Sequence, residues 1–246
     1  MDQLVKADRL LVALDVPSGT EALAVADRVG GAAGGFKVGS RLFTSEGPDF
    51  VRTLARSGER IFLDLKFHDI PNTVATAVAA ATSLGVWMVN VHASGGLRMM
   101  QAARDAAHET AAGEGRARPL VIAVTVLTSM NDAMLAETGV SGGVLDQVLR
   151  LAELAQKAGL DGVVASPQET SLLRKACGPD FAIVTPGIRG GRAATGARDD
   201  QERTMAPAEA ISAGASYLVV GRPIIAAPNA RKAAEEIARE IALAAG

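Results

Sequence analysis

The sequence of 246 residues is poor in cysteine and in aromatic residues. Cys177 is the single cysteine, which excludes an internal disulfide bond and a metal cluster held by several thiolates. Aromatic residues make up 3% of the chain, too few for the stacking platforms that bind single-stranded nucleic acids. The formal net charge of −2 also argues against a nucleic-acid or membrane-surface binder. We therefore expect no nucleic-acid partner.

Long hydrophobic runs are absent as well. The longest apolar-rich stretch, residues 120–127, is far shorter than the roughly 20 residues of a membrane-spanning helix. The N-terminal residues lack the basic start and the apolar stretch of a signal peptide. We therefore expect a cytoplasmic protein with no membrane partner.

The sequence is rich in a regular alternation of two kinds of segment. Eight short runs have the apolar, β-branched character of buried parallel strands: residues 10–14, 36–38, 61–65, 86–91, 120–127, 162–165, 181–185 and 217–220. Alanine-rich amphipathic segments lie between them, among them residues 21–29, 72–84, 97–112, 144–158 and 230–244. Such alternation predicts a parallel sheet, which is either closed into a barrel or doubly wound.

The positions of the polar residues favour the barrel. A polar residue lies at or just beyond the C-terminal end of each predicted strand: Asp15, Lys37, Lys66, His92, Ser129, Ser166, Arg189 and Arg222. A closed barrel brings these ends together on one face, where the active sites of such barrels are found. Barrels of this type typically have about 250 residues. We therefore predict an α/β protein with one domain, a single (β/α)8 TIM barrel over residues 1–246.

The densest group of charges follows the third predicted strand, where residues 64–73 read DLKFHDIPNT. Side chains alternate along a strand, so Asp64 and Lys66 are expected on one face. Asp69 follows near the start of a helix introduced by Pro71. Two carboxylates beside the Lys66 ammonium group would keep it charged and able to donate a proton. The alternative is a surface ion pair, but these charges end a hydrophobic strand.

Two more charged residues end the first two predicted strands. Lys37 lies in the segment FKVG, and Asp15 ends the segment ALD. Together with the charges around Lys66 they would form an alternating network. For Asp15, a role as the cap of the following helix is equally open.

These segments make the chain similar to the bacterial type of orotidine 5'-phosphate decarboxylase. The resemblance covers nearly the whole chain in order, through residues 13–15, 37–39, 64–73, 91–96, 124–129, 185–189 and 220–224. It implies the conversion of orotidine 5'-monophosphate to uridine 5'-monophosphate and carbon dioxide, the last step of de novo UMP biosynthesis. It also implies a homodimer that uses no cofactor and no metal.

The resemblance further implies a role for individual residues. Lys66 would protonate C6 of the pyrimidine, Asp64 would lie near the substrate carboxylate, and Lys37 would order the charges and touch the ribose. Asp69 and Thr73 would reach into the partner's site. The other substrate-binding residues would be Asp15 at the ribose, Thr128 and Ser129 at the pyrimidine, and Pro186, Arg189, Gln201, Gly221 and Arg222.

The phosphate group has its own candidate site. Gly221 and Arg222 follow the eighth predicted strand, where barrels often bind phosphate through backbone N–H groups and a short helix. Arg189 closes the seventh strand and could make a bidentate contact. Residues 190–203, rich in Gly, Ala and Arg, are typical of a mobile lid, from which the resemblance directs Gln201 to the phosphate. The alternative for both arginines is a solvated surface position.

Two other functions are weighed against this one. Magnesium-dependent sugar-phosphate decarboxylases and aldolases of the same barrel group share the DxKxxD motif, but carry an acidic residue where this chain has Lys37. They would also need acidic or histidine ligands where Thr125, Thr128 and Ser129 stand. A non-catalytic phosphosugar-binding protein would have no need of Lys66 between carboxylates.

The remaining candidate residues have simpler interpretations. His92 could line the site, but a hydrogen-bonded structural histidine is the favoured role. Cys177 has no companion histidine nearby in the sequence and is interpreted as structural. His108 and Glu109 lack the second histidine of a zinc-protease helix and are expected to be an exposed pair.

Overall fold

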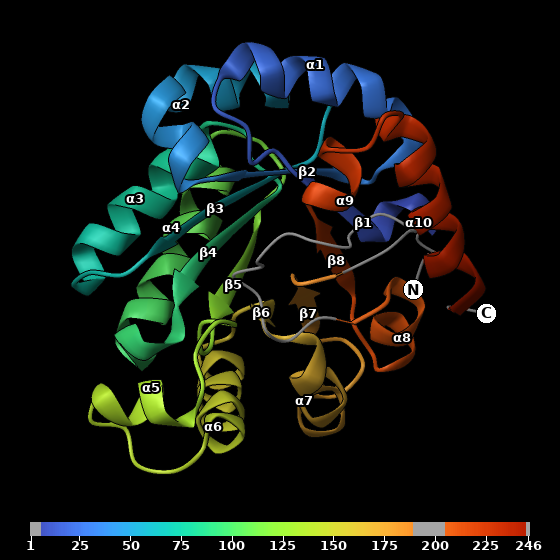
Figure 1. The fold of residues 1–246 in the computed structure, drawn as a ribbon. Helices are drawn as coiled ribbons and strands as arrows, with labels where there is room; N and C mark the ends of the chain where they lie inside the picture. Colours follow the sequence, from blue (N-terminus) through green and yellow to red (C-terminus); the bar gives the residue numbers. More distant parts are fainter. Residues whose placement is uncertain (1–5, 189–204, 245–246) are drawn as a thin grey trace.

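The computed structural model describes residues 6–188 and 205–244, and its strands form a closed barrel (Figure 1). All pairings are parallel and follow chain order, and β1 closes the barrel on β8. The strands are β1 Leu10–Ala13, β2 Gly35–Gly39, β3 Ile61–Phe67, β4 Met88–His92, β5 Leu120–Val124, β6 Gly162–Val164, β7 Ala182–Thr185 and β8 Tyr217–Val220. The predicted (β/α)8 barrel is therefore confirmed.

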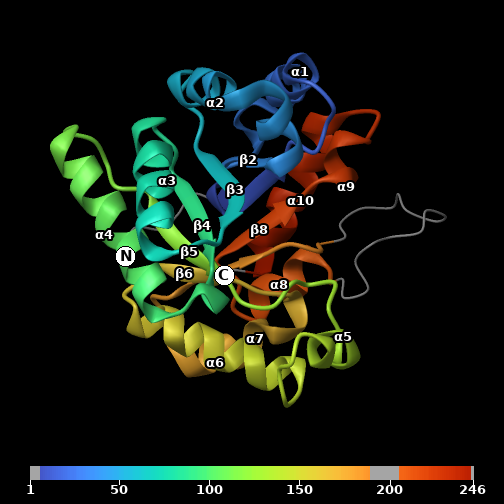
Figure 2. The same ribbon diagram turned by 90° about the vertical axis from the view of Figure 1, so that its left-hand side faces the viewer.

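Helices surround the barrel on its outside (Figures 1 and 2). The α-helices are α1 Gly19–Val29, α2 Ser40–Arg56, α3 Pro71–Ser83, α4 Leu97–Gly113, α5 Asp132–Glu137, α6 Val144–Lys157, α7 Thr170–Cys177, α8 Pro207–Ser212, α9 Arg222–Ile225 and α10 Ala230–Ala244. Short 3-10 helices span Lys6–Arg9, Gly30–Ala32, Ala93–Gly95 and Pro167–Glu169. Within the described part of the chain, no helix is both long and apolar enough to cross a membrane.

The boundaries of two helices have clear chemical reasons. The Ser18 side chain caps α1 by accepting a hydrogen bond from the backbone N–H of Glu21, at 3.3 Å. Gly159 follows α6 with a φ of +76°, a conformation that favours glycine. Asp15 is therefore not the cap of α1, and that alternative is wrong because Ser18 occupies the capping position.

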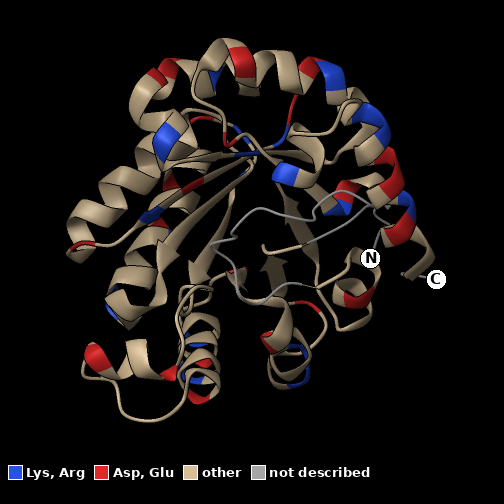
Figure 3. Cartoon of the chain, in the orientation of Figure 1, with Lys and Arg blue, Asp and Glu red and all other residues tan. Residues whose placement is uncertain are grey.

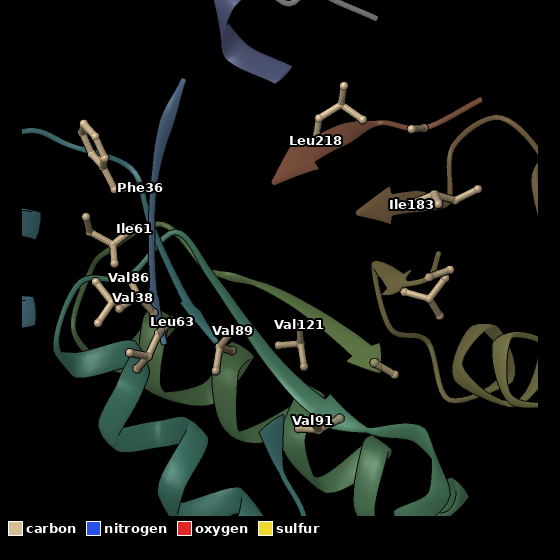
Figure 4. Packing of buried hydrophobic residues seen from close by; sticks show 14 of the residues in the cluster. Phe36, Val38, Ile61, Leu63, Val86, Val89, Val91, Val121, Ile183 and Leu218 are labelled. Carbon is tan, nitrogen blue, oxygen red and sulfur yellow. The ribbon is translucent and has the colours of Figure 1, made fainter. Parts of the chain in front are cut away.

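The hydrophobic core lies on both sides of the sheet. Leu63 and Val89 belong to the layer between the strands and the helices, which Figure 4 shows from close by. Phe62 and Met88, their neighbours in sequence, instead pack together inside the barrel. This alternation follows from the period of two along a strand. Since apolar side chains fill the barrel interior, a binding site can form only at one of its ends.

The same alternation brings polar side chains to the C-terminal end of the interior. Asp64 lies two residues after Phe62, and Asn90 lies two residues after Met88, so both continue the inward-facing rows. Lys37 of β2 is in register with Phe62 of β3. These three side chains form a polar layer above the apolar ones, whereas many other charged residues lie on outer helices such as α1 and α10 (Figure 3).

The end of β3 departs from regular strand geometry. Leu63 is in register with Val89, but Phe67 is in register with Val91, so four steps along β3 match two along β4. Within this irregularity Lys66 has a φ of +55°, the one positive φ among the described residues other than glycine. The side chains of Asp64 and Lys66 do meet, as predicted, but the predicted reason, regular alternation along the strand, is wrong.

Candidate active site

Four charged side chains meet at the C-terminal end of β1, β2 and β3. The Lys66 ammonium Nζ lies 2.7 Å from Oδ1 of Asp64. Lys37 Nζ lies 3.6 Å from the other oxygen of Asp64 and 3.0 Å from Oδ1 of Asp15. The order is thus Asp15, Lys37, Asp64, Lys66, with alternating sign. The predicted network is confirmed for these four residues.

Asp64 is the most enclosed carboxylate of this network. Its side chain is 13% exposed, compared with 60% for Asp15. Burial alone raises the pKa of Asp64, but the positive charges of Lys37 and Lys66 outweigh burial and lower it below its usual value. Asp64 is therefore a carboxylate at neutral pH and presents a fixed negative charge between two ammonium groups.

Asn90 of β4 completes the surroundings of Asp64. Its Nδ2 donates a hydrogen bond to Oδ1 of Asp64 at 2.7 Å, and its Oδ1 accepts one from the backbone N–H of Lys66 at 2.8 Å. Asn90 is not among the site residues predicted from the sequence. A signal was present, since Asn90 is the one polar residue in the otherwise apolar segment 86–91 and shares the inward face with Met88.

Asp69 and Thr73 lie outside the network of their own chain. Both are exposed, on the β3–α3 turn and the first turn of α3. Oδ1 of Asp69 accepts a hydrogen bond from the adjacent backbone N–H of Ile70, at 2.6 Å. Among the described residues of one chain, therefore, Lys66 forms an ion pair with Asp64 and not with Asp69, and the expectation of two flanking carboxylates from the same chain is wrong there.

The predicted substrate-binding residues follow the ends of three further strands. Thr128 and Ser129 lie in the loop after β5, and Pro186 directly follows β7. Gly221 and Arg222 follow β8, and Arg222 begins α9. A Cβ atom placed on Gly221 would lie 3.6 Å from Oδ2 of Asp15, so the end of β8 adjoins the charge network.

Two predicted ligands and one predicted loop fall outside the described residues. These are Arg189, Gln201 and the lid at residues 190–203. Ser166, which follows β6, is fully buried, and its hydroxyl has no hydrogen-bond partner in the part of the chain that the structure describes. The inference that a polar residue at each strand end lines an open face is therefore wrong for Ser166.

The His92 ring lies at the edge of the network, beside the His68 ring. The two ring centroids are 5.4 Å apart. Burial, followed by the charges of His68 and Lys66, lowers the pKa of His92, so its ring is neutral at pH 7. The His92 ring makes no hydrogen bond to any residue within 6–188 or 205–244. The expectation that His92 is a structural histidine held by a hydrogen bond is therefore wrong for the described residues.

Two other expectations concern residues away from the site. Cys177 is buried at the end of α7, which agrees with a structural role. His108 and Glu109 are exposed on α4, as expected. Among the residues described, no three side chains of His, Cys, Asp or Glu are grouped so that they could hold a metal ion.

Known proteins resemble this chain over almost its entire length. A model of the orotidine 5'-phosphate decarboxylase / HUMPS family matches residues 8–237. The orotidine 5'-phosphate decarboxylase of Moorella thermoacetica is 54% identical over 235 residues, which cover 95% of this chain and 92% of that protein. The protein of the same name from Photobacterium profundum is 52% identical over 234 residues, 95% of this chain and 98% of its own.

Solved structures agree with these sequence relatives. The orotidine 5'-phosphate decarboxylase of Lactobacillus acidophilus has a TM-score of 0.83 at 38% identity, over 94% of this chain and 98% of that one. Its counterpart from Pyrococcus horikoshii has a TM-score of 0.75 at 27% identity, over 95% and 99%. The resemblance that seven short segments predicted is therefore confirmed, and the chain belongs to the orotidine 5'-phosphate decarboxylase / HUMPS family.

Proposed function

We propose that this protein is a carboxy-lyase that converts orotidine 5'-monophosphate to uridine 5'-monophosphate and carbon dioxide, in pyrimidine biosynthesis. The relatives at 52–54% identity carry the name of that enzyme. The observation that carries the proposal in this chain is the alternating network of Asp15, Lys37, Asp64 and Lys66 at the C-terminal end of the barrel.

The reaction needs a positive charge that is already in place. When the bond between C6 and the carboxylate breaks, carbon dioxide leaves and its electron pair stays on C6. No neighbouring π system takes up this pair, so the barrier is high, and catalysis must supply on the order of 20 kcal/mol. The ammonium group of Lys66 stabilises the developing charge and then gives C6 its proton. Water later returns a proton to the lysine.

The other residues of the network hold this charge in place. Asp64 holds the Lys66 ammonium group through an ion pair of 2.7 Å and faces the carboxylate of the substrate. Lys37, 3.0 Å from Asp15, ties the network to the end of β1, where we assign the ribose. Gly221 adjoins Asp15 at the end of β8 and is followed by Arg222; here we assign the phosphate, together with Arg189 and Gln201. Thr128, Ser129 and Pro186 are assigned to the pyrimidine.

The active unit in this proposal is a homodimer. Asp69 and Thr73 are exposed and take no part in the network of their own chain. Ile70 between them is 66% exposed, which is unusual for a large apolar side chain beside a site. We assign Asp69 and Thr73 to the site of the partner subunit, with Ile70 buried between the two chains.

A direct assay tests the reaction. The purified protein is incubated with orotidine 5'-monophosphate and EDTA, and the loss of the substrate's ultraviolet absorption is followed. We expect turnover by the wild type and a loss of at least about 1,000-fold in Lys66→Ala. Lys157→Ala, which removes an exposed lysine of α6, is the matched control and should keep full activity. No turnover by the wild type would refute the proposed reaction.

Mixing two variants tests the shared site. Asp69→Ala and Lys66→Ala are each expected to be nearly inactive alone. A mixed dimer has one site that combines the intact Lys66 of one chain with the intact Asp69 of the other. We therefore expect activity to return on mixing, toward one quarter of the wild-type value for random exchange. Two inactive variants that stay inactive after proven subunit exchange would refute the shared site.

The magnesium-dependent sugar-phosphate enzymes of the same barrel group remain the second candidate, because they share the DxKxxD motif of residues 64–69. In this chain, however, the Lys37 ammonium group lies between the carboxylates of Asp15 and Asp64, within 3.6 Å of both. A bound cation there would be repelled by that charge. Turnover that EDTA abolishes and magnesium restores would favour this candidate over the one proposed.

A further inference from the structure

One polar side chain lies inside the barrel without a role in binding substrate. Asn90 is in the middle of β4, and no part of it is exposed. It shares its face of the strand with Met88, which packs in the apolar barrel interior. A buried amide is costly unless its donor and its acceptor are both satisfied. The partners of Asn90 therefore define its role.

Both ends of the Asn90 amide bond to β3. Its Nδ2 donates to the carboxylate of Asp64, and its Oδ1 accepts from the backbone N–H of Lys66. A carboxylate cannot donate and a backbone N–H cannot accept, so these contacts fix which end of the amide is which. The side chain at this position must therefore offer one donor and one acceptor at the same time.

The acceptor end supports an unusual backbone. Lys66 has a φ of +55°, which residues with a side chain adopt only where contacts hold them there. At this point the register between β3 and β4 shifts: four residues along β3, from Leu63 to Phe67, correspond to two along β4, from Val89 to Val91. The Asn90 side chain bridges that irregularity and gives the Lys66 N–H its partner.

The donor end orients the carboxylate. Oδ1 of Asp64 receives both the Asn90 amide and the Lys66 ammonium group, each at 2.7 Å, while Oδ2 faces Lys37 at 3.6 Å. We propose that Asn90 is a positioning residue for the decarboxylation: it fixes the Asp64 carboxylate and the Lys66 backbone together, so that the Lys66 ammonium group is held at one place. The inference rests on the proposed function.

The variant Asn90→Asp tests the donor directly. It keeps the shape of the side chain but turns an oxygen, negatively charged at high pH, toward Asp64. A displaced ammonium group should lower kcat by about 100-fold at pH 8. Protonation of the introduced carboxyl group restores one donor and one acceptor. Its burial beside a negative charge raises the pH at which this happens.

The expected signature is therefore a pH profile. We expect the ratio of variant to wild-type kcat to rise by about 10-fold or more between pH 8 and pH 5.5. The charged and titratable groups around the amide are Asp64, Lys66 and Lys37 on β3 and β2, His92 on β4 and His68 in the loop after β3. All are present in both proteins, so a change in the ratio reports the effect of the introduced carboxyl group. Binding of uridine 5'-monophosphate should change by less than about threefold, because its assigned ligands lie at the ends of β1, β2, β5, β7 and β8, whereas the Asn90 side chain bonds to Asp64 and Lys66.

Two further variants make the test decisive. Asn229→Asp makes the same chemical change where Asn229 accepts from the backbone N–H of Lys232 near the start of α10, a position that a carboxylate serves equally well. It should behave as wild type at every pH. Asn90→Ser removes the amide without adding charge, and should show the same loss of kcat with no recovery at low pH.

Each outcome decides the matter. A folded Asn90→Asp or Asn90→Ser variant whose kcat stays within about threefold of wild type at every pH overturns the inference alone. Loss of uridine 5'-monophosphate binding in parallel with kcat, in both variants, shows a merely structural role and also overturns it. A wild type without turnover overturns both this inference and the proposed function.

Discussion

Arg174 joins the segments at the N-terminal ends of β7 and β8, so its loss should lower the stability of the barrel. It lies on α7, and its guanidinium group donates to the carbonyl oxygens of Gly214, Phe181 and Pro179 at 2.8–3.1 Å. It also donates to the carbonyl of Gly178 and to the Ser216 hydroxyl. One side chain thus joins the end of α7 to the segments that lead into β7 and β8.

The expected cost follows from these contacts. A hydrogen bond from a charged donor contributes about 1.5–3 kcal/mol when buried. Arg174 is partly exposed, and water can replace some of its bonds, which reduces each contribution. We therefore expect Arg174→Ala to lower the free energy of unfolding by about 2–4 kcal/mol. For a chain of this length, that corresponds to a drop of roughly 5–15 °C in Tm.

Urea unfolding followed by tryptophan fluorescence measures this loss. Trp87 is the single tryptophan, and it packs edge-on against Tyr217 in the barrel. All samples need the same protein concentration, because association would shift apparent stability. Arg150→Ala is the matched control, since exposed Arg150 donates only to the Gln147 side chain. It should change the free energy by less than about 0.5 kcal/mol.

A third variant separates charge from shape. Arg174→Lys keeps the positive charge but cannot reach several carbonyl groups at once, so it should lose most of the stability that Arg174→Ala loses. If Arg174→Ala proves no less stable than Arg150→Ala, water satisfies the freed carbonyl groups and the reasoning is refuted. If Arg174→Lys is as stable as wild type, charge alone matters and the fork geometry does not.

Two further predictions concern His92 and the packing of β6. Burial is the main cause that lowers the pKa of His92, so the stability that this residue confers is complete above the unfolded pKa of 6.5 and is lost as pH falls through the folded pKa. His92→Asn should therefore reduce the change in the urea midpoint of unfolding between pH 7 and pH 5. His108→Asn, which changes an exposed histidine, should leave that change as it is in wild type. A Cβ on Gly162 would lie 2.1 Å from the carbonyl oxygen of Ala182, so Gly162→Ala should lower the free energy of unfolding by about 1–3 kcal/mol or more. A Cβ on Gly113 would meet open space, so Gly113→Ala should not lower the free energy of unfolding in the same assay.

The strands could be predicted because their apolar runs are short and bounded. The prediction fails where apolar residues continue beyond the strand. Residues 125–127 extend the run of β5, but the strand ends at Val124 and Leu127 is 42% exposed. Apolar character does not distinguish a strand from the loop that follows it. Conversely, β3 runs on to Phe67, past the predicted end, because Phe67 pairs again with Val91 of β4 after the irregularity.

The charge network could be predicted in part, for a geometric reason. Asp15 lies just after β1, and Lys37 and Asp64 each lie one residue before the end of a predicted strand. Barrel closure brings these parts of the strands together whatever the details of packing. The contact with Asn90 depends on the register between β3 and β4, which the sequence does not display. The φ of Lys66 likewise arises from a shift between two strands, so no local pattern announces it.

The polar end of the barrel also explains why its residues act as a unit. Asp15, Lys37, Asp64 and Lys66 carry two negative and two positive charges, so the group is neutral in sum. Removing one charge leaves its buried partner uncompensated, which costs more than the ion pair itself contributes. In the proposed reaction, a substrate carboxylate beside Asp64 would add one negative charge to this group, and loss of neutral carbon dioxide would move that charge to C6, beside the Lys66 ammonium group. The fixed ammonium group of Lys66 would then interact more strongly with the developing charge on C6 than with the bound substrate, and this difference is what an enzyme for decarboxylation requires.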